Sequence, residues 1–374
     1  MKAAESALKH IKPGVRSVAP YTLRQLEAPI KLNQNESPYD VPAELKQRLW
    51  ERLAQRPWNR YPPFVPADLT AAVAEAVDWP TEGILLGNGS NELIQALLAT
   101  VIEPGRSVVV PEPTFTLYRL LTQVGGGSVV PAPLDESLRF DVSGIVAAAA
   151  RNQATAIVLC TPNNPTGTAL TREEIEAIHD GSDALIVLDQ AYVEFGGYDA
   201  VPLLKDRPRL LILRTLSKAM SLAGLRAGYM LGHPALVREI GKAKLPYNVN
   251  FVTESVAAEV LRHRELLVPN QEAIRVQRDR LFDGLGRLHG LHVFPTAANF
   301  VLFRVEAGEL DHRAVFQRLL EDHGVLVRDV SGYPMLQGCL RVTAGTPEET
   351  GAFLEAMAEV MKGGVDRRQS TVNS

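Results

Sequence analysis

Short runs of consecutive apolar residues recur along the first two thirds of the chain and alternate with segments of helical periodicity. The runs are rich in Val, Ile and Leu, and residues 171–179, between two of them, show a helical pattern. Strands that are apolar at every position are typical of a parallel sheet covered on both faces. We therefore expect an α/β fold with a mainly parallel sheet, whose strands lie at residues 83–87, 107–111, 155–160, 184–189 and 210–214.

The last hundred residues show a different order of elements. Helices are expected near 270–289, near 312–323 and from 347, with strands near 291–294, 299–305, 325–328 and 339–343. This order predicts a smaller α+β domain. The first fifty residues hold five prolines and little periodicity, which favours an extended arm. We therefore expect an N-terminal arm (1–48), a large domain (49–272), a small C-terminal domain (273–362) and a flexible tail (363–374).

Composition narrows the class of protein. Of 374 residues, 46% are hydrophobic and 22% are charged, which is typical of a folded globular protein. The 39 Lys and Arg residues are fewer than the 43 Asp and Glu, and a net charge of −4 argues against a nucleic-acid partner. No apolar run is long enough for a signal peptide or a membrane span, and two cysteines are too few for a disulfide framework or a cysteine-based zinc site. We expect a cytoplasmic protein without a metal site or a membrane partner.

Residues suited to chemistry follow the ends of the expected strands. Asp189 closes one strand, the turn TPNNPTG (161–167) follows another, and Lys218 lies four residues after a third. In open parallel sheets, ligands bind beyond the carboxyl ends of the strands. One pocket is therefore expected to collect all three.

Lys218 has neighbours that suit a phosphate and a reactive amine. Thr215 and Ser217 supply hydroxyls, and Arg226 follows eight residues after the lysine. The three residues after Lys218 are uncharged, which favours a lowered lysine pKa, as Schiff-base chemistry requires. The ordinary alternative is a solvated surface lysine.

Asp189 ends an otherwise apolar strand, so its carboxylate needs a partner. A protonated ring nitrogen would serve, and so would an arginine or the start of a following helix. Tyr192 lies three residues further on, and Asn164 in the 161–167 turn offers an amide donor suited to a phenolate oxygen. Together these residues suit a cofactor with a nitrogen-containing ring.

The segment GNGSN (87–91) follows an apolar strand and opens an amphipathic helix. Backbone N–H groups at the start of such a helix can hold a phosphate. The alternative is that Ser90 only caps the helix, with Glu92 in its first turn. This segment is therefore a second candidate for binding an anion.

Taken together, these motifs resemble the fold-type I pyridoxal-phosphate aminotransferases, specifically the histidinol-phosphate aminotransferase branch. The resemblance covers nearly the whole chain. It is carried by KLNQNESPY (31–39), RYP (60–62), GNGSNELI (87–94), TPNNPTG (161–167), LDQAYVEF (188–195), TLSKAMSLAGLRAGY (215–229), KLPYNVN (244–250), ANFVLFR (298–304), VLVRD (325–329) and LRVTAGTPEE (340–349). Gln190 stands where the family pattern usually has glutamate, and Phe115 where this branch often has tyrosine.

The resemblance implies a large domain that binds pyridoxal 5'-phosphate (PLP), an N-terminal arm that joins the small domain, and a homodimer whose subunits share their active sites. Lys218 would form the Schiff base, Asp189 would hold the pyridine nitrogen, and Tyr192 would act beside them. The other cofactor-binding residues that it implies are Gly89, Ser90, Asn91, Thr215, Ser217 and Arg226 at the phosphate, Tyr61 from the other subunit, Asn164 at the phenolic oxygen and Phe115 over one ring face.

For the substrates, the resemblance places Arg341 on an α-carboxylate, where its planar fork gives two hydrogen bonds. Arg328 and Tyr21 would recognise the phosphate of histidinol phosphate, and Asn35 would help the arm to close over the site. The implied reaction exchanges an amino group between L-glutamate or 2-oxoglutarate and the histidinol phosphate/imidazole-acetol phosphate pair in histidine biosynthesis.

Three alternatives to that reaction stay open at this point. Relatives in the same branch act on aromatic amino acids, and a PLP decarboxylase of a phosphorylated amino acid shares the scaffold. A regulatory protein that only senses PLP is the third. Such a protein carries a DNA-binding module ahead of the domain, and fewer than 50 residues precede the expected large domain here.

Overall fold

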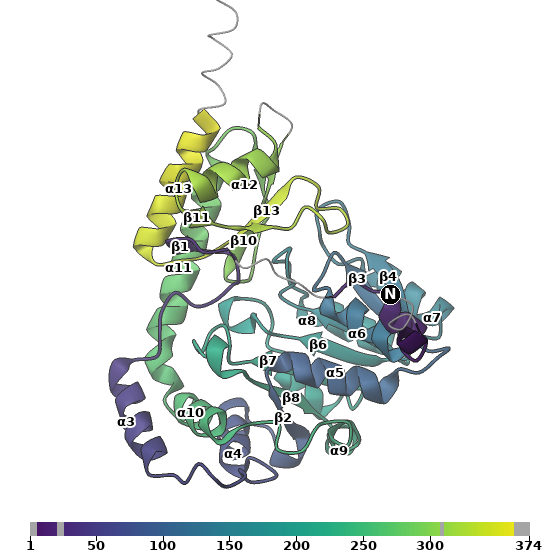
Figure 1. Ribbon diagram of the computed structural model, residues 1–374. Helices are drawn as coiled ribbons and strands as arrows, with labels where there is room; N and C mark the ends of the chain where they lie inside the picture. The colour runs from purple at the N-terminus through teal and green to yellow at the C-terminus, as the bar shows by residue number, and fades with distance from the viewer. Residues whose placement is uncertain (1–5, 21–25, 307–309, 363–374) are drawn as a thin grey trace, which may run out of the picture.

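A seven-stranded sheet forms the centre of the larger part of the molecule (Figure 1). The computed structural model describes residues 6–20, 26–306 and 310–362. In spatial order the strands are β2 (Ile84–Asn88), β8 (Ala227–Gly232), β7 (Leu210–Thr215), β6 (Leu185–Asp189), β5 (Ala156–Cys160), β3 (Ser107–Glu112) and β4 (Ser128–Pro133). Neighbours pair in parallel except for β8, which runs antiparallel to β2 and β7. The expected mainly parallel α/β fold is confirmed.

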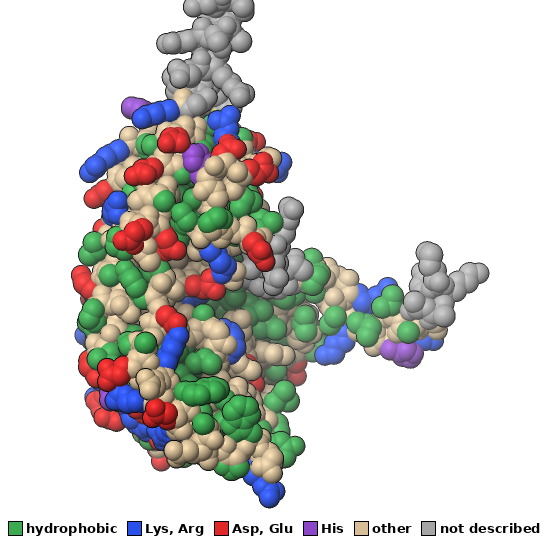
Figure 2. Space-filling view, turned by 60° about the vertical axis from the view of Figure 1, so that its left-hand side comes forward, with side chains coloured by type: hydrophobic (Ala, Val, Ile, Leu, Met, Phe, Trp, Pro, Cys, Tyr) green, Lys and Arg blue, Asp and Glu red, His purple; other side chains and the backbone are tan. Residues whose placement is uncertain are grey.

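The surface carries no large region of one charge sign on the face shown in Figure 2, where acidic and basic side chains are interspersed. This mixture agrees with the small net charge of −4. In the part of the chain that the structure describes, no helix is both long enough and apolar enough to cross a membrane.

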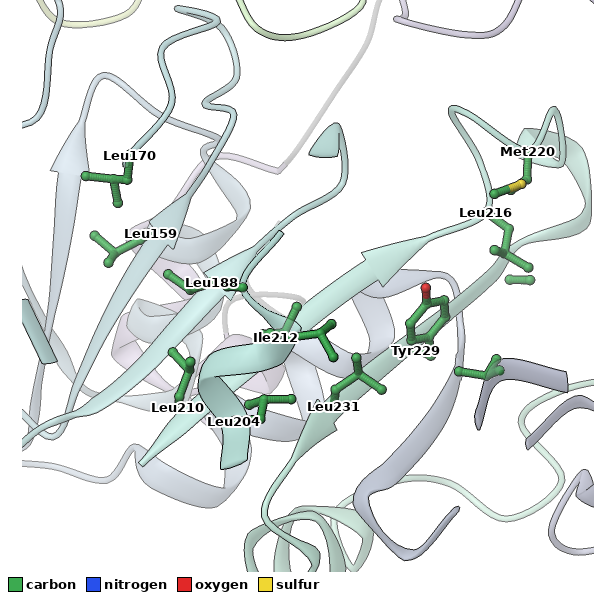
Figure 3. Close-up of a cluster of buried hydrophobic side chains, with 14 of the residues drawn as sticks. Leu159, Leu170, Leu188, Leu204, Leu210, Ile212, Leu216, Met220, Tyr229 and Leu231 are labelled. Atoms are coloured by element: carbon green, nitrogen blue, oxygen red, sulfur yellow. The ribbon is translucent and has the colours of Figure 1, made fainter. Parts of the chain in front are cut away.

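Helices cover both faces of the large sheet. One face carries α5 (Ser90–Val101), α6 (Leu117–Gly125) and α9 (Pro234–Gly241), and the other carries α4 (Ala67–Val77), α7 (Val142–Arg151), α8 (Arg172–Asp180) and α10 (Phe251–Arg262). Successive side chains of a strand point to opposite faces, so Leu211 packs in one core cluster and Ile212 in the other. Figure 3 shows the second cluster, in which Leu188, Ile212 and Leu231 line up across three paired strands. Burial on both faces explains why these strands are apolar at every position.

A four-stranded antiparallel sheet forms the centre of the smaller part. Its order is β12 (Arg328–Asp329), β13 (Cys339–Thr343), β10 (Phe300–Val305) and β9 (Leu291–Val293). Helices α11 (Val268–Gly286), α12 (His312–Glu321) and α13 (Pro347–Lys362) supply the rest of its core. In Figure 1, α11 runs from beside α10 up to this sheet. Near the start of the chain, β1 (Ile30–Lys31) pairs in parallel with β11 (Val325–Leu326).

The structure contains elements that the sequence pattern did not indicate. Strand β8 includes Gly228 and Gly232, and β4 is partly exposed and includes two prolines, so neither reads as an apolar run. Helix α3 (Ala43–Ala54) begins inside the expected extended arm and buries Leu45 and Leu49. The short elements are α2 (Pro13–Arg16), η1 (Thr81–Gly83), η2 (Val193–Phe195), η3 (Val201–Lys205), η4 (Ala223–Leu225) and η5 (Arg264–Leu267). The expected tail, 363–374, lies outside the described residues.

Candidate active site

A pocket of about 280 Å³ lies where the carboxyl ends of β5, β6 and β7 meet the small sheet. Predicted site residues from distant parts of the sequence line it together. They are Asn35, Ser90, Asn91, Phe115, Asn164, Asp189, Tyr192, Thr215, Ser217, Lys218, Arg226, Arg328 and Arg341. The strand ends therefore converge on one pocket, as the general rule for such sheets requires.

The Asp189 carboxylate is buried in the pocket wall, with 3% of the residue exposed. Its Oδ2 accepts a hydrogen bond from the Tyr118 hydroxyl at 2.7 Å, and its Oδ1 accepts one from the Ala191 backbone N–H at 3.1 Å. Burial raises the pKa of Asp189, and these two donors oppose the rise. Within the described residues, Asp189 forms no ion pair with an arginine, so that alternative for its partner is not what the structure shows.

Lys218 is half-buried in the loop that follows β7, and its Nζ donates to the Gln34 carbonyl at 2.9 Å. Burial, together with the positive charges of Arg341 and Arg226, lowers the pKa of Lys218 to about 7, while Glu36 opposes the shift. A substantial fraction of the amine is therefore neutral near neutral pH. A nucleophile or a proton acceptor requires that form.

The loops after β2 and β7 form a cradle with the shape and charge for a phosphate. Gly89 precedes α5 with φ 77°, and a Cβ at this position would lie 2.5 Å from the Arg226 guanidinium. Arg226 donates to the Ser217 hydroxyl at 3.3 Å, and the Thr215 hydroxyl accepts from the Ser217 backbone N–H at 3.1 Å. Ser90 is the first residue of α5 rather than its cap, so the capping alternative is wrong. A guanidinium, hydroxyls and a helix start thus face the same space.

Tyr192 and Asn164 each accept a hydrogen bond that leaves the side chain with a donor still available. Asn35 donates from Nδ2 to the Tyr192 hydroxyl oxygen at 3.0 Å, which leaves the Tyr192 proton free to be donated elsewhere. Arg341 donates to Asn164 Oδ1, so the amide nitrogen of Asn164 remains a donor. This part of the wall can therefore donate two hydrogen bonds to a ligand oxygen.

Two arginines lie opposite each other in the small sheet and reach the same pocket. Arg328 on β12 is the register partner of Arg341 on β13. Arg341 is 7% exposed, donates to the Asn33 carbonyl at 2.9 Å and stacks over Phe300 at 5.0 Å. Within the described residues, no acidic side chain pairs with Arg328. Like charges directly opposite are unfavourable unless an anion lies between them, so the pair favours an anionic ligand.

Some predicted residues do not line the pocket. Tyr61 is 83% exposed and stacks on Tyr247, with ring centroids 4.8 Å apart. Tyr21 lies outside the described residues. Gly89 contributes through the cradle described above. The Gln190 side chain is turned away from the pocket, because its Oε1 accepts from Arg214 at 3.0 Å.

The structure also places in the wall residues for which the sequence predicted no individual role. Tyr118 has the clearest contact, and its only signal in the sequence is its position three residues after Phe115. Groups of the arm and of the loop after β12 can be identified as pocket lining only from the tertiary structure. These additional lining residues are Asn33, Gln34, Tyr118, Cys160, Ala191, Val330 and Tyr333.

Comparison with known proteins identifies the family of the chain. Residues 27–357 match the family model described as aminotransferase class I and II. The chain therefore belongs to this family, and its resemblance to the histidinol-phosphate aminotransferase branch is confirmed.

The similar proteins cover almost all of the chain. It is 39% identical over 358 residues to a histidinol-phosphate aminotransferase of Chlorobium phaeovibrioides, covering 95% of this chain and 98% of that one. It is 37% identical to histidinol-phosphate aminotransferase 2 of Bordetella bronchiseptica, covering 96% and 98%. The histidinol-phosphate aminotransferase of Sinorhizobium meliloti, solved in complex with pyridoxal-5'-phosphate, matches with a TM-score of 0.85 and 26% identity, covering 96% of this chain and 99% of that one.

The pKa of Lys218 can be measured by trace labelling with acetic anhydride in protein freed of small ligands. The labelling rate of Lys218 should reach half of its maximum near pH 7, because its pKa is about 7 and only the neutral amine reacts. Exposed Lys205 provides the reference for reagent loss, and peptide mass analysis reads both rates. A Lys218 rate that rises only above pH 9 would contradict the assignment.

Proposed function

We propose that this chain is a PLP-dependent aminotransferase that exchanges an amino group between L-glutamate or 2-oxoglutarate and the histidinol phosphate/imidazole-acetol phosphate pair. The observation that carries the proposal is one pocket that holds an amine of pKa about 7, a buried carboxylate and an arginine pair. The names of the similar proteins support the same reaction. Histidine biosynthesis is the pathway that uses it.

The donor set of the pocket fits PLP group by group. The space beside Gly89 is one that a Cβ would fill, and with Arg226, Thr215 and Ser217 it suits the phosphate, together with Ser90 and Asn91 at the start of α5. Asp189 would accept from the ring N–H. Tyr192 and Asn164 would donate to the ring's phenolic oxygen, and Phe115 would cover one ring face. Bound PLP supplies an electron-withdrawing ring that stabilises negative charge at the substrate Cα.

Lys218 is the residue that would move the proton. Once its Nζ is a free amine with a pKa near 7, it would take a proton from the substrate Cα and deliver it to C4′ of the cofactor. The Gln34 carbonyl, 2.9 Å from Nζ, orients the amine without adding a charge. The two donors to Asp189 favour its ionised form, which would hold the ring nitrogen in its protonated form. The roles of the lysine and the carboxylate are thus separated by their environments.

The arginine pair would select the substrates. Arg341 presents a planar fork to the α-carboxylate of glutamate, and its stacking on Phe300 holds the guanidinium plane. Arg328, which lacks an acidic partner among the described residues, would bind the phosphate of histidinol phosphate. Tyr21 would assist at that phosphate. Asn35, tied to Tyr192 and to Thr343, would hold the arm against the site.

A homodimer with shared sites is part of this proposal. Trp58, Tyr61 and Phe64 are each more than half exposed, and Tyr61 and Phe64 both contact the Tyr247 ring. A cluster of exposed aromatic rings marks a protein interface more often than a free surface. Tyr61 would then reach the cofactor phosphate of the partner subunit.

The division of the chain and its location complete the proposal. The arm (1–48) would belong with the small domain (273–362), because β1 pairs with β11 and Leu32 packs in the core of the small domain. The large domain would span 49–272, although α3 crosses its first boundary. Both cysteines are buried and unpaired, which suits the reducing cytoplasm in which we place the enzyme.

Borohydride reduction in the presence of PLP tests the cofactor assignment. The label should appear at Lys218, because no other amine lines the pocket with a lowered pKa. Lys218→Ala should lose both the label and transamination, whereas Lys205→Ala, at an exposed position, should keep both. Peptide mapping identifies the labelled lysine, and a label on any other lysine would overturn the assignment.

Arg328→Ala tests the substrate. Removing a charge-assisted hydrogen bond costs about 1.5–3 kcal/mol, so kcat/KM with histidinol phosphate should fall roughly 10- to 150-fold. Residual activity with phenylalanine, which has no phosphate, should change much less. Arg313→Ala, an exposed arginine of the same domain, is the control. Equal damage to both substrates would favour the aromatic aminotransferase alternative.

Subunit mixing tests the shared site. Tyr61→Phe should weaken PLP retention, because a phosphate contact is lost across the interface. When Tyr61→Phe and Lys218→Ala subunits are mixed, each heterodimer should regain one site in which both residues are native. Ultrafiltration followed by cofactor absorbance measures retention. No recovery relative to the unmixed variants would show that each site is contained within one subunit.

A further inference from the structure

Tyr118 is buried beside Asp189 and has no role in the function proposed so far. It is the second residue of α6 and is 0% exposed. Its hydroxyl donates to Asp189 Oδ2 at 2.7 Å. Burial and the neighbouring carboxylate raise the pKa of Tyr118 well above its usual value, so the hydroxyl remains a donor at any working pH.

The other groups that face Asp189 cannot replace this donor. Cys160 on β5 is the register partner of Asp189, and burial raises the pKa of its thiol, which lies 3.4 Å from the Pro162 carbonyl. Tyr192, beyond the end of β6, is not among the hydrogen-bond donors to Asp189, and its proton is the one proposed to reach the phenolic oxygen. Lys218 lies in the same pocket, and its Nζ donates to the Gln34 carbonyl. The carboxylate therefore depends on Tyr118 and the Ala191 N–H.

The ring of Tyr118 also touches the residue expected over the cofactor face. Phe115 meets it edge-on, with ring centroids 5.6 Å apart and planes at 86°. The hydroxyl thus contacts Asp189 and the Cys160 thiol, whereas the ring contacts Phe115. Replacement by phenylalanine removes the hydroxyl contacts and keeps the ring contact, so the two contributions can be separated by experiment.

We propose that Tyr118 is a positioning residue for the cofactor: its hydroxyl keeps Asp189 ionised and oriented toward the ring nitrogen. Without that donor, the buried carboxylate would take up a proton more readily, and a neutral acid cannot hold a protonated ring nitrogen. This inference rests on the proposed function, because the ring nitrogen belongs to the PLP that the pocket is proposed to bind.

Titration of the apoenzyme with PLP between pH 6 and pH 9 tests this proposal without reference to activity. In Tyr118→Phe the dissociation constant of PLP should rise about tenfold or more at the acid end, the effect of losing a hydrogen bond to a charged group. Loss of the donor raises the pKa of Asp189, so affinity should begin to fall at a higher pH than in the wild type, and the difference should narrow as pH rises. In the holoenzyme, kcat should fall for both half-reactions with little change in KM.

Two further variants separate positioning from a general structural role. Tyr229→Phe removes another buried hydroxyl, one beside Arg214 instead of Asp189, and should leave PLP affinity and its pH dependence unchanged. In an Asp189→Asn background, Tyr118→Phe should add no further loss of affinity, because its effect passes through the carboxylate. An unchanged PLP dissociation constant in Tyr118→Phe, or the same loss in both backgrounds, would overturn the inference. Failure of the wild type to bind PLP would instead overturn the proposed function.

Discussion

A carboxylate buried at the end of a central strand can remain ionised only if fixed donors replace water, and the site around Asp189 is organised by this requirement. Strand β6 lies in the middle of the large sheet, with β5 and β7 on either side. Solvent reaches such a position poorly, so the donors must come from the protein. Tyr118 on α6 and the Ala191 backbone N–H provide them. One of the two donors therefore comes from a helix that packs against the sheet.

The same low access to solvent shifts the pKa of Lys218 in the opposite direction. It raises the pKa of Asp189 but lowers that of the lysine. Burial disfavours the charged amine, and the arginines that gather anions around the pocket disfavour it further. Bound anions at Arg226 and Arg341 would reduce that repulsion and favour the protonated lysine. The affinity of the pocket for anions and the proton affinity of Lys218 are therefore coupled, so ligand binding and the protonation state of the amine change together.

Sequence patterns predicted most strands of the large sheet and most of the residues that line the pocket. Strands such as β5 and β7 were readable because both of their faces are buried, which leaves an uninterrupted apolar run. Strand β8 was not readable, because Gly228 and Gly232 interrupt its apolar run. A Cβ at Gly228 would lie 2.5 Å from the Ser90 backbone nitrogen. The glycine thus reflects a contact with the loop before α5 that is remote in sequence.

The sequence by itself determined the α/β class and the family to which the chain belongs, and it identified Lys218 and Asp189 as candidate site residues. These features depend on local periodicity and on motifs of adjacent residues. Only the tertiary structure decided that Tyr118 donates to Asp189 and that Arg328 faces Arg341 across two strands. It also decided that the Gln34 carbonyl of the arm meets Lys218, 184 positions away. Such pairings depend on strand register and on the packing of distant segments, which no local pattern of side chains encodes.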